Sequence, residues 1–105
     1  FKNKDYVFAL FCAHLSLEKI LKAHWIKDNV NNHPPKIHNL PYLVSQTKLN
    51  ASNEQMIFLE RMNTFQLEGR YPDYRVKINL VYNSKRTSVI IAEANSLRKW
   101  LIKNL

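Results

Sequence analysis

The chain has 105 residues, the length of a single domain, and 46% of them are hydrophobic, which is too many for a disordered segment. Its only glycine is Gly69, and this scarcity favours helices because all-β folds use glycine at their turns. A lone cysteine excludes an internal disulfide, and no apolar run approaches the roughly 20 residues of a membrane-spanning helix. We therefore expect one all-α domain, residues 1–105, in the cytoplasm.

The formal charge of +8 is unevenly distributed along the chain. Residues 1–69 contain eight Lys/Arg and six Asp/Glu, whereas residues 70–105 contain eight Lys/Arg and two Asp/Glu. A basic half of this kind attracts phosphate groups or an acidic protein. It equally serves as a solvated surface that keeps a protein in solution. Charge alone leaves these interpretations open, since no aromatic-interleaved RNA motif accompanies it.

Residues 4–28 are predicted to form a long first helix, because apolar side chains recur there with the helical period. Most other positions are also apolar, so neighbours should surround this helix within the bundle or across a dimer. Cys12 lies in this helix, and we expect a buried, unreactive thiol in a reducing compartment. The sequence opens with Phe1 rather than Met, which suggests a trimmed or disordered start. We therefore expect that some residues of the first helix are missing before Phe1.

A short second helix is predicted over residues 40–48, after a connection rich in asparagine and proline. Asn39 is a suitable N-cap, and Pro41 falls in the first turn, where a missing N–H costs nothing. Leu40, Leu43 and Val44 lie at helical spacing along it.

The third predicted helix lies within the segment NASNEQMIFLERMNTFQLEG, residues 50–69. Ser52 or Asn53 can cap it, and Gln55 suits a capping box that begins at Ser52. Gly69 is well placed to end it. Its inner face is predicted to consist of Ile57, Phe58, Met62 and Phe65.

The segment RYPDYRVKINLVYNSKR is predicted to be an irregular crossover, although VKINLVY alternates enough to be extended. The last helix runs from about Lys85 to Lys103. Four helical segments with short links predict an up-and-down four-helix bundle with an irregular crossover before the last helix. The apolar face of the last helix is predicted to consist of Val89, Ile90, Ala92, Leu97, Trp100 and Leu101.

An ordered polar stripe interrupts the apolar first helix. His14, Glu18 and Lys22 recur every four residues, which places them on one helix face. A surface salt bridge is one interpretation of this spacing. The alternative is a partly enclosed polar network or a dimer seam, because most of this helix is expected to be packed against neighbours. A metal site is disfavoured, because no second pair of ligands has suitable spacing. We expect His38 to bond to backbone at the start of the second helix.

The loop motif RYPDY combines charge with aromatic rings. Arg70 and Asp73 can form a local ion pair that orders the crossover. Alternatively, Arg70 and Arg75 grip phosphate while Tyr71 or Tyr74 stacks on a base. The density of such side chains in one loop favours a functional interpretation.

In order, these motifs resemble the HEPN family of small helical bundles, which occur alone or beside minimal nucleotidyltransferases. Members have an aromatic-rich first helix that ends like AHLSLEKILKAHW, with Glu18, Lys19 and Lys22 at the matching positions. Their second helix begins like HNLPYLV. One branch carries RYPD, here Arg70–Asp73, after the third helix. The resemblance covers nearly the whole chain. It implies a four- to five-helix bundle that handles nucleotides or RNA and usually dimerises. The polar stripe would then line the bundle or dimer cleft.

This sequence departs from the catalytic members of the family in one respect. Those members are metal-independent ribonucleases with an arginine followed, four to six residues later, by a histidine that transfers protons. All four histidines here, the last of them His38, precede the first arginine, Arg61, so the signature is absent from this sequence.

The sequence therefore favours a non-catalytic, homodimeric HEPN module that needs no cofactor or metal. It would bind a nucleotide or RNA, with a minimal nucleotidyltransferase as a partner. One alternative is a metal-independent ribonuclease of toxin type, and another is a protein-binding member of a toxin–antitoxin pair whose basic half meets an acidic partner. The predicted binding residues are Arg70, Tyr71, Asp73, Arg75, Lys22, His14 and Glu18.

Overall fold

The computed structural model describes residues 6–29, 36–66 and 82–105. In these ranges no residue is in a strand, and the prediction of an all-α bundle is confirmed. The predicted crossover lies mostly outside the described residues. The elements are four α-helices, α1 (Tyr6–Asp28), α2 (Leu40–Ser45), α3 (Asn53–Met62) and α5 (Ser84–Lys103), and a short 3-10 helix, η1 (Asn63–Phe65).

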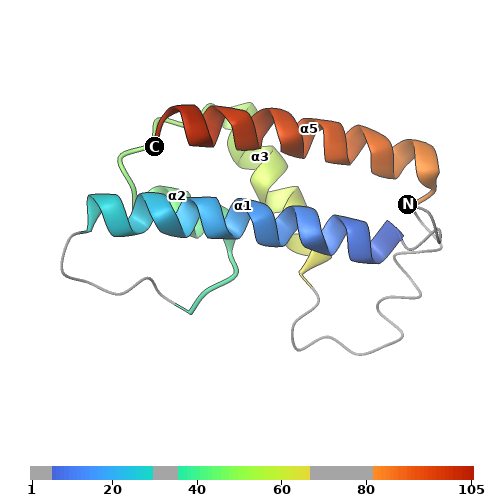
Figure 1. Cartoon of the computed structure of the whole chain (residues 1–105), viewed down its shortest axis with the longest axis horizontal. Coiled ribbons are helices and arrows are strands. Elements are labelled where there is room, and N and C mark those ends of the chain that lie inside the picture. The colour runs from blue at the N-terminus through green and yellow to red at the C-terminus, as the bar shows by residue number, and fades with distance from the viewer. Residues whose placement is uncertain (1–5, 30–35, 67–81) are drawn as a thin grey trace.

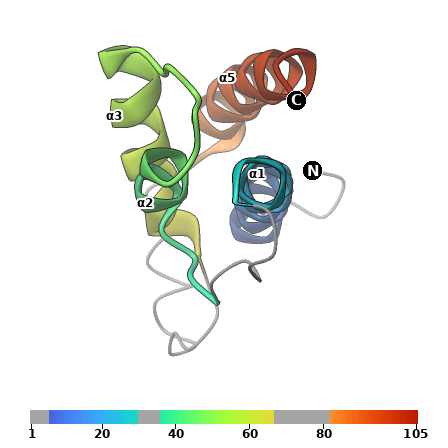
Figure 2. The same cartoon turned by 90° about the vertical axis from the view of Figure 1, so that its left-hand side faces the viewer.

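The two long helices, α1 and α5, lie side by side and run in the same direction (Figure 1). Their C-terminal ends therefore meet, and His24 near the end of α1 contacts Leu101 near the end of α5. Figure 2 shows α2 between α1 and α3, while α3 and α5 diverge from one another. The first and last helices of the bundle are thus parallel, with the two shorter helices packed to one side.

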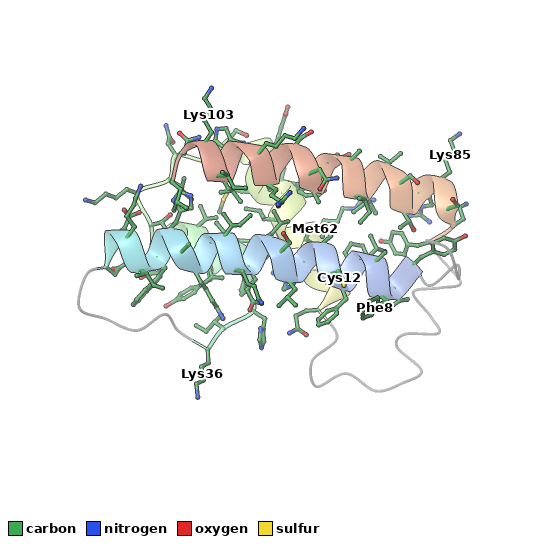
Figure 3. The ribbon with its side chains drawn as sticks, viewed as in Figure 1. Phe8, Cys12, Lys36, Met62, Lys85 and Lys103 are labelled. Carbon is green, nitrogen blue, oxygen red and sulfur yellow. The ribbon has the colours of Figure 1, made fainter. Side chains whose placement is uncertain are left out.

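A single hydrophobic core fills the space between these helices. From α1 it takes residues spaced by three or four positions, as expected for one side of a helix. Its fully buried side chains include Met62, which is the last residue of α3 and is labelled in Figure 3. The other core residues are Val7, Leu10, Leu17, Leu21, Leu40, Leu43, Val44, Leu59, Phe65, Ile90, Ala94, Leu97 and Leu101.

The opposite side of α1 is exposed, contrary to the prediction of a helix enclosed nearly all round. Phe8 is 54% exposed and Ile26 is 52% exposed. The prediction that Cys12 is buried is wrong, because Cys12 lies one turn after Phe8 on this open side. Both sides of the helix are apolar, so the sequence pattern could not indicate which of them faces the core.

The predicted helix starts are confirmed for α2 and α3. Asn39 Oδ1 accepts a hydrogen bond from the Tyr42 backbone N–H, and Pro41 lies in the first turn of α2. Ser52 and Gln55 form the reciprocal capping box at the start of α3, with distances of 3.1 and 2.8 Å. These local hydrogen bonds satisfy N–H groups that have no partner within the helix.

Two predicted apolar faces need correction. In α3, Ile57 is 67% exposed and Leu59 is buried in its place. In α5, Val89 is 53% exposed and Ala92 is also exposed. The reason is the same in both helices, because only a narrow stripe of each touches α1 or α2 and the flanking apolar residues reach solvent.

Candidate functional site

The polar stripe of α1 forms a compact network around the carboxylate of Glu18, which is only 5% exposed. His38 donates from Nδ1 to Glu18 Oε1 over 2.9 Å. Lys22 donates from Nζ to Glu18 Oε2 over 3.2 Å. A buried carboxylate is costly without partners, and here each of its two oxygens has one. The enclosed network, rather than a surface salt bridge, is therefore the correct interpretation of the stripe.

His14 completes the network from inside the core. It is 0% exposed, and its Nε2 donates to the backbone oxygen of His38 over 3.1 Å. Its Nδ1 has no hydrogen-bond partner and lies 3.9 Å from Glu18 Oε1. Burial lowers the pKa of His14 from its usual 6.5, and this outweighs the opposing attraction of the Glu18 carboxylate. His14 is therefore neutral at pH 7, with its proton on Nε2.

A second asparagine joins the start of α2 to the end of α3. Asn63 Oδ1 accepts from the Leu40 backbone N–H over 3.1 Å, and its Nδ2 donates to Asn39 Oδ1, also over 3.1 Å. These bonds tie the segment that carries His38 to the end of α3, and the His38–Glu18 hydrogen bond ties it to α1. Sequence reasoning missed Asn63, whose only signal is an amide side chain at the C-cap of α3.

The network is closed on its inner side and open on its outer side. The Glu18 side chain is 6% exposed, whereas those of Lys22 and His38 are 22% and 38% exposed. Lys36, two residues before His38, points away from the body of the protein (Figure 3). An approaching ligand would therefore meet an ammonium group and an imidazole before it met the carboxylate.

This arrangement suits anion binding and proton exchange. A histidine held through Nδ1 by a carboxylate has a fixed orientation, and the pair can accept or release a proton. Lys22 supplies a positive charge beside it. Within the described residues, no group of three or more His, Cys, Asp or Glu side chains could hold a metal ion.

The structure brings three of the predicted binding residues together. His14, Glu18 and Lys22 meet at the network, although His14 is buried and cannot touch a ligand in this conformation. His38 was predicted to bond to backbone; its side chain instead binds the Glu18 carboxylate, and its own backbone oxygen accepts from His14. The remaining predicted residues, Arg70, Tyr71, Asp73 and Arg75, lie outside the described residues.

Helix α5 presents a second basic surface on its side away from α1. Its sequence contains five Lys/Arg and a single acidic residue, Glu93, and all six of these side chains are exposed. Lys85 and Lys103 point away from α1 at its two ends (Figure 3). Arg86 lies over the ring of Tyr82, 4.7 Å from its centroid, which anchors the first turn. We call Lys85, Lys99 and Lys103, which lie on the side of α5 opposite its buried stripe, the α5 basic face; Arg86 and Arg98 lie on the two flanks of the helix.

No helix in the described part of the chain is both long and apolar enough to cross a bilayer. A search of curated proteins and a search of solved structures each gave no match. The family model for the HEPN domain matches residues 1–105, which is the entire sequence. The all-helical architecture agrees with this match. The chain therefore belongs to the HEPN domain family.

Proposed function

We propose that this HEPN domain is a non-catalytic, dimeric module that binds a nucleotide or an RNA segment. It would belong to the RYPD-containing branch and act in the cytoplasm beside a minimal nucleotidyltransferase. The observation that carries the proposal is α5, which has five exposed cations and one carboxylate, with three of the cations on the α5 basic face. An excess of cations on one face is the electrostatic signature of phosphate binding.

The spacing of the α5 basic face suits an extended phosphate backbone. Lys85 and Lys99 are separated by about 21 Å along the helix axis, at 1.5 Å per residue. The side chains between them on the outer side are short and uncharged, namely Ser88, Val89, Ala92 and Ser96. A nucleic-acid backbone could therefore approach the helix closely along its length.

The network around Glu18 supplies the second element of the proposal. Lys22 reaches solvent and would contact an anion, while Glu18 and His14 hold Lys22 and His38 in position. In the RYPD segment, Arg70 and Arg75 would bind phosphate, Tyr71 would stack on a base and Asp73 would order the segment. These roles rest on the sequence motif and its resemblance to the family.

The absence of catalysis is proposed from the order of residues in the sequence. The family's ribonuclease signature needs a histidine after an arginine, and here every histidine precedes Arg61. Phosphate would therefore be bound without the proton transfer that cleaves RNA in catalytic members.

Binding to a labelled RNA across a salt series tests this function, with EDTA present. We expect Lys85→Gln/Lys99→Gln and Arg70→Ala each to weaken binding and to flatten the salt dependence, by about one unit of slope per lost phosphate contact. The control Lys36→Gln/Arg61→Gln removes the same charge from other exposed positions and should change binding less. Equal losses in both double variants, or no binding at low salt, would contradict the proposal. Sedimentation equilibrium tests the dimer, and a monomer at all concentrations would exclude it.

The pairing of His38 with Glu18 favours ribonuclease activity as a second candidate function. A partly exposed imidazole held by a buried carboxylate over 2.9 Å is suited to general acid–base chemistry. The same labelled RNA would then be cleaved in EDTA, and His38→Gln and Arg70→Ala would each abolish cleavage. Intact RNA after long incubation would exclude ribonuclease activity and leave binding as the proposed function.

A groove between α3 and α5 favours the third candidate, a protein-binding member of a toxin–antitoxin pair. The groove has a volume of about 440 Å³, with Phe58 and Leu97 on its floor and Glu54 and Glu93 among its lining residues. Retained affinity for a partner protein without any RNA binding would support this candidate.

A further inference from the structure

A pocket of about 350 Å³ lies where the parallel helices α1 and α5 end, beside the segment that follows α2. It lies some two and a half turns further along α1 than Glu18, so it is separate from the network. We call it the terminal pocket. Its lining includes His24, Lys27, Lys48, Asn50, Trp100 and Asn104.

Hydrogen bonds between three segments hold the walls of the terminal pocket in place. His24 donates from Nε2 to the backbone oxygen of Leu101 over 2.8 Å. Asp28 Oδ2 accepts from the Lys48 backbone N–H over 2.8 Å, which ties the end of α1 to the segment after α2. Asn29 donates from Nδ2 to the backbone oxygen of Gln46 over 2.9 Å. A pocket held in this way needs little rearrangement to receive a ligand.

The lining combines three kinds of group that suit a nucleotide. Trp100 is half-buried and offers an indole ring for stacking. Asn50 offers an amide, which can donate to and accept from the edge of a base. Asn104 offers its Oδ1 and a second N–H, because one N–H already donates to the Trp100 backbone oxygen over 2.8 Å. Lys27 and Lys48 offer two ammonium groups on exposed side chains.

The charges of the pocket favour an anion over a cation. Its one carboxylate, Asp28, already accepts a backbone hydrogen bond, whereas it has two lysines. Lys27 Nζ lies 3.4 Å from the backbone oxygen of Asn104, which leaves an ammonium group with further hydrogens to donate. The volume is at the small end of the range for small-molecule sites, about 300–1,000 Å³, which fits one nucleotide unit.

We infer that the terminal pocket binds a single nucleotide unit, as a mononucleotide or as the end of an RNA strand. The base stacks on Trp100 and bonds to the amides of Asn50 and Asn104, and the phosphate lies between Lys27 and Lys48. This inference takes its ligand class from the proposed function, but it uses none of the residues of the α5 basic face or the Glu18 network.

Fluorescence of Trp100 tests the inference directly. The chain has two tryptophans, so Trp25→Phe leaves Trp100 as the only indole. The probes are AMP, adenosine and inorganic phosphate, added separately. We expect AMP to quench Trp100 emission to saturation, and adenosine or phosphate to bind at least about tenfold more weakly, because each makes only part of the contacts. If phosphate binds as tightly as AMP, the base contributes nothing to binding, and the proposed stacking on Trp100 is wrong.

Matched lysine variants assign the binding to the pocket. Lys48→Ala should weaken AMP binding at least about fivefold, whereas Lys36→Ala, at an exposed position before α2, should leave it unchanged. Should Trp25→Phe fail to fold, calorimetric titration of AMP into the wild type, Lys48→Ala and Trp100→Leu gives the same comparison. No saturable binding, or binding that is unchanged in Lys48→Ala, would overturn the inference.

The RNA assay separates this inference from the proposed function. If RNA still binds through the α5 basic face and AMP does not bind, the inference about the terminal pocket is wrong and the proposed function stands. AMP binding through Lys48 with no RNA binding would support the pocket and overturn the RNA surface on α5.

Discussion

His24 of α1 donates from Nε2 to the backbone oxygen of Leu101 in α5 over 2.8 Å, although the two residues are 77 positions apart in the chain. Both residues are buried, with exposures of 1% and 0%. Leu101 belongs to the last turn of α5, whose carbonyl groups lack partners within the helix. The imidazole therefore caps one helix from the side of another and fixes the register of the parallel pair.

We expect His24→Leu to lower the free energy of unfolding by about 1–3 kcal/mol, because it leaves the buried Leu101 carbonyl without a partner. Urea denaturation followed by circular dichroism measures this change. The control is Lys27→Ala, which removes an exposed contact of 3.4 Å to the Asn104 oxygen and should cost less than about 0.5 kcal/mol. A His24→Leu protein as stable as this control would show that the cap contributes nothing.

The Glu18 carboxylate should be the most sensitive position of the network. Glu18→Gln keeps the shape of the side chain but removes the charge that holds Lys22 and His38. We expect a loss of about 2–4 kcal/mol in the free energy of unfolding, since two donors then lose a charged acceptor. Glu60→Gln, on the exposed side of α3, is the control and should change stability by less than about 0.5 kcal/mol. Equal effects of the two substitutions would contradict a structural role for the network.

The helix positions could be predicted because their signals are local in the sequence. The capping box of Ser52 and Gln55 and the N-cap Asn39 lie within three residues of the groups they satisfy. The orientation of α1 could not be predicted in the same way. Leu10 and Cys12 are both suited to a core, and only packing against α5 and α2 decides that the first is buried and the second exposed.

The site was predicted in part for the same reason. The spacing of His14, Glu18 and Lys22 is visible in the sequence, because i, i+4 positions share a helix face. The contributions of His38 and Asn63 depend on how a connecting segment and the end of α3 fold back onto α1. Nothing local in the sequence marks those long-range contacts.

The buried imidazole of His14 should make stability depend on pH. Burial lowers the pKa of His14 below its usual 6.5 and outweighs the opposing effects of the Glu18 carboxylate and of the hydrogen bond to the His38 backbone oxygen. The unfolded chain therefore binds a proton at this position more readily than the folded chain does. The stabilisation is complete above the unfolded pKa and is lost as the pH falls below about 6.5 toward the lower folded pKa.

Urea titrations between about pH 5 and pH 8 measure this dependence. The variant His14→Gln retains an amide that can donate to the His38 oxygen but does not titrate. We expect the wild type to lose stability more steeply than His14→Gln as the pH falls. Parallel profiles for the two proteins would show that His14 does not contribute to the dependence.

Cys12 should react with a thiol reagent while the protein is folded. The side chain lies on the exposed side of α1, one turn after the exposed Phe8 (Figure 3). We expect the native protein to react with dithiobis(nitrobenzoic acid) within about tenfold of the rate in urea, since no opening of the fold is needed first. A buried thiol would instead be protected roughly in proportion to the unfolding equilibrium, by a factor of about a thousand or more. Protection of that size would restore the original prediction of a buried Cys12, and a one-to-one adduct formed under native conditions would confirm that this side of α1 is open.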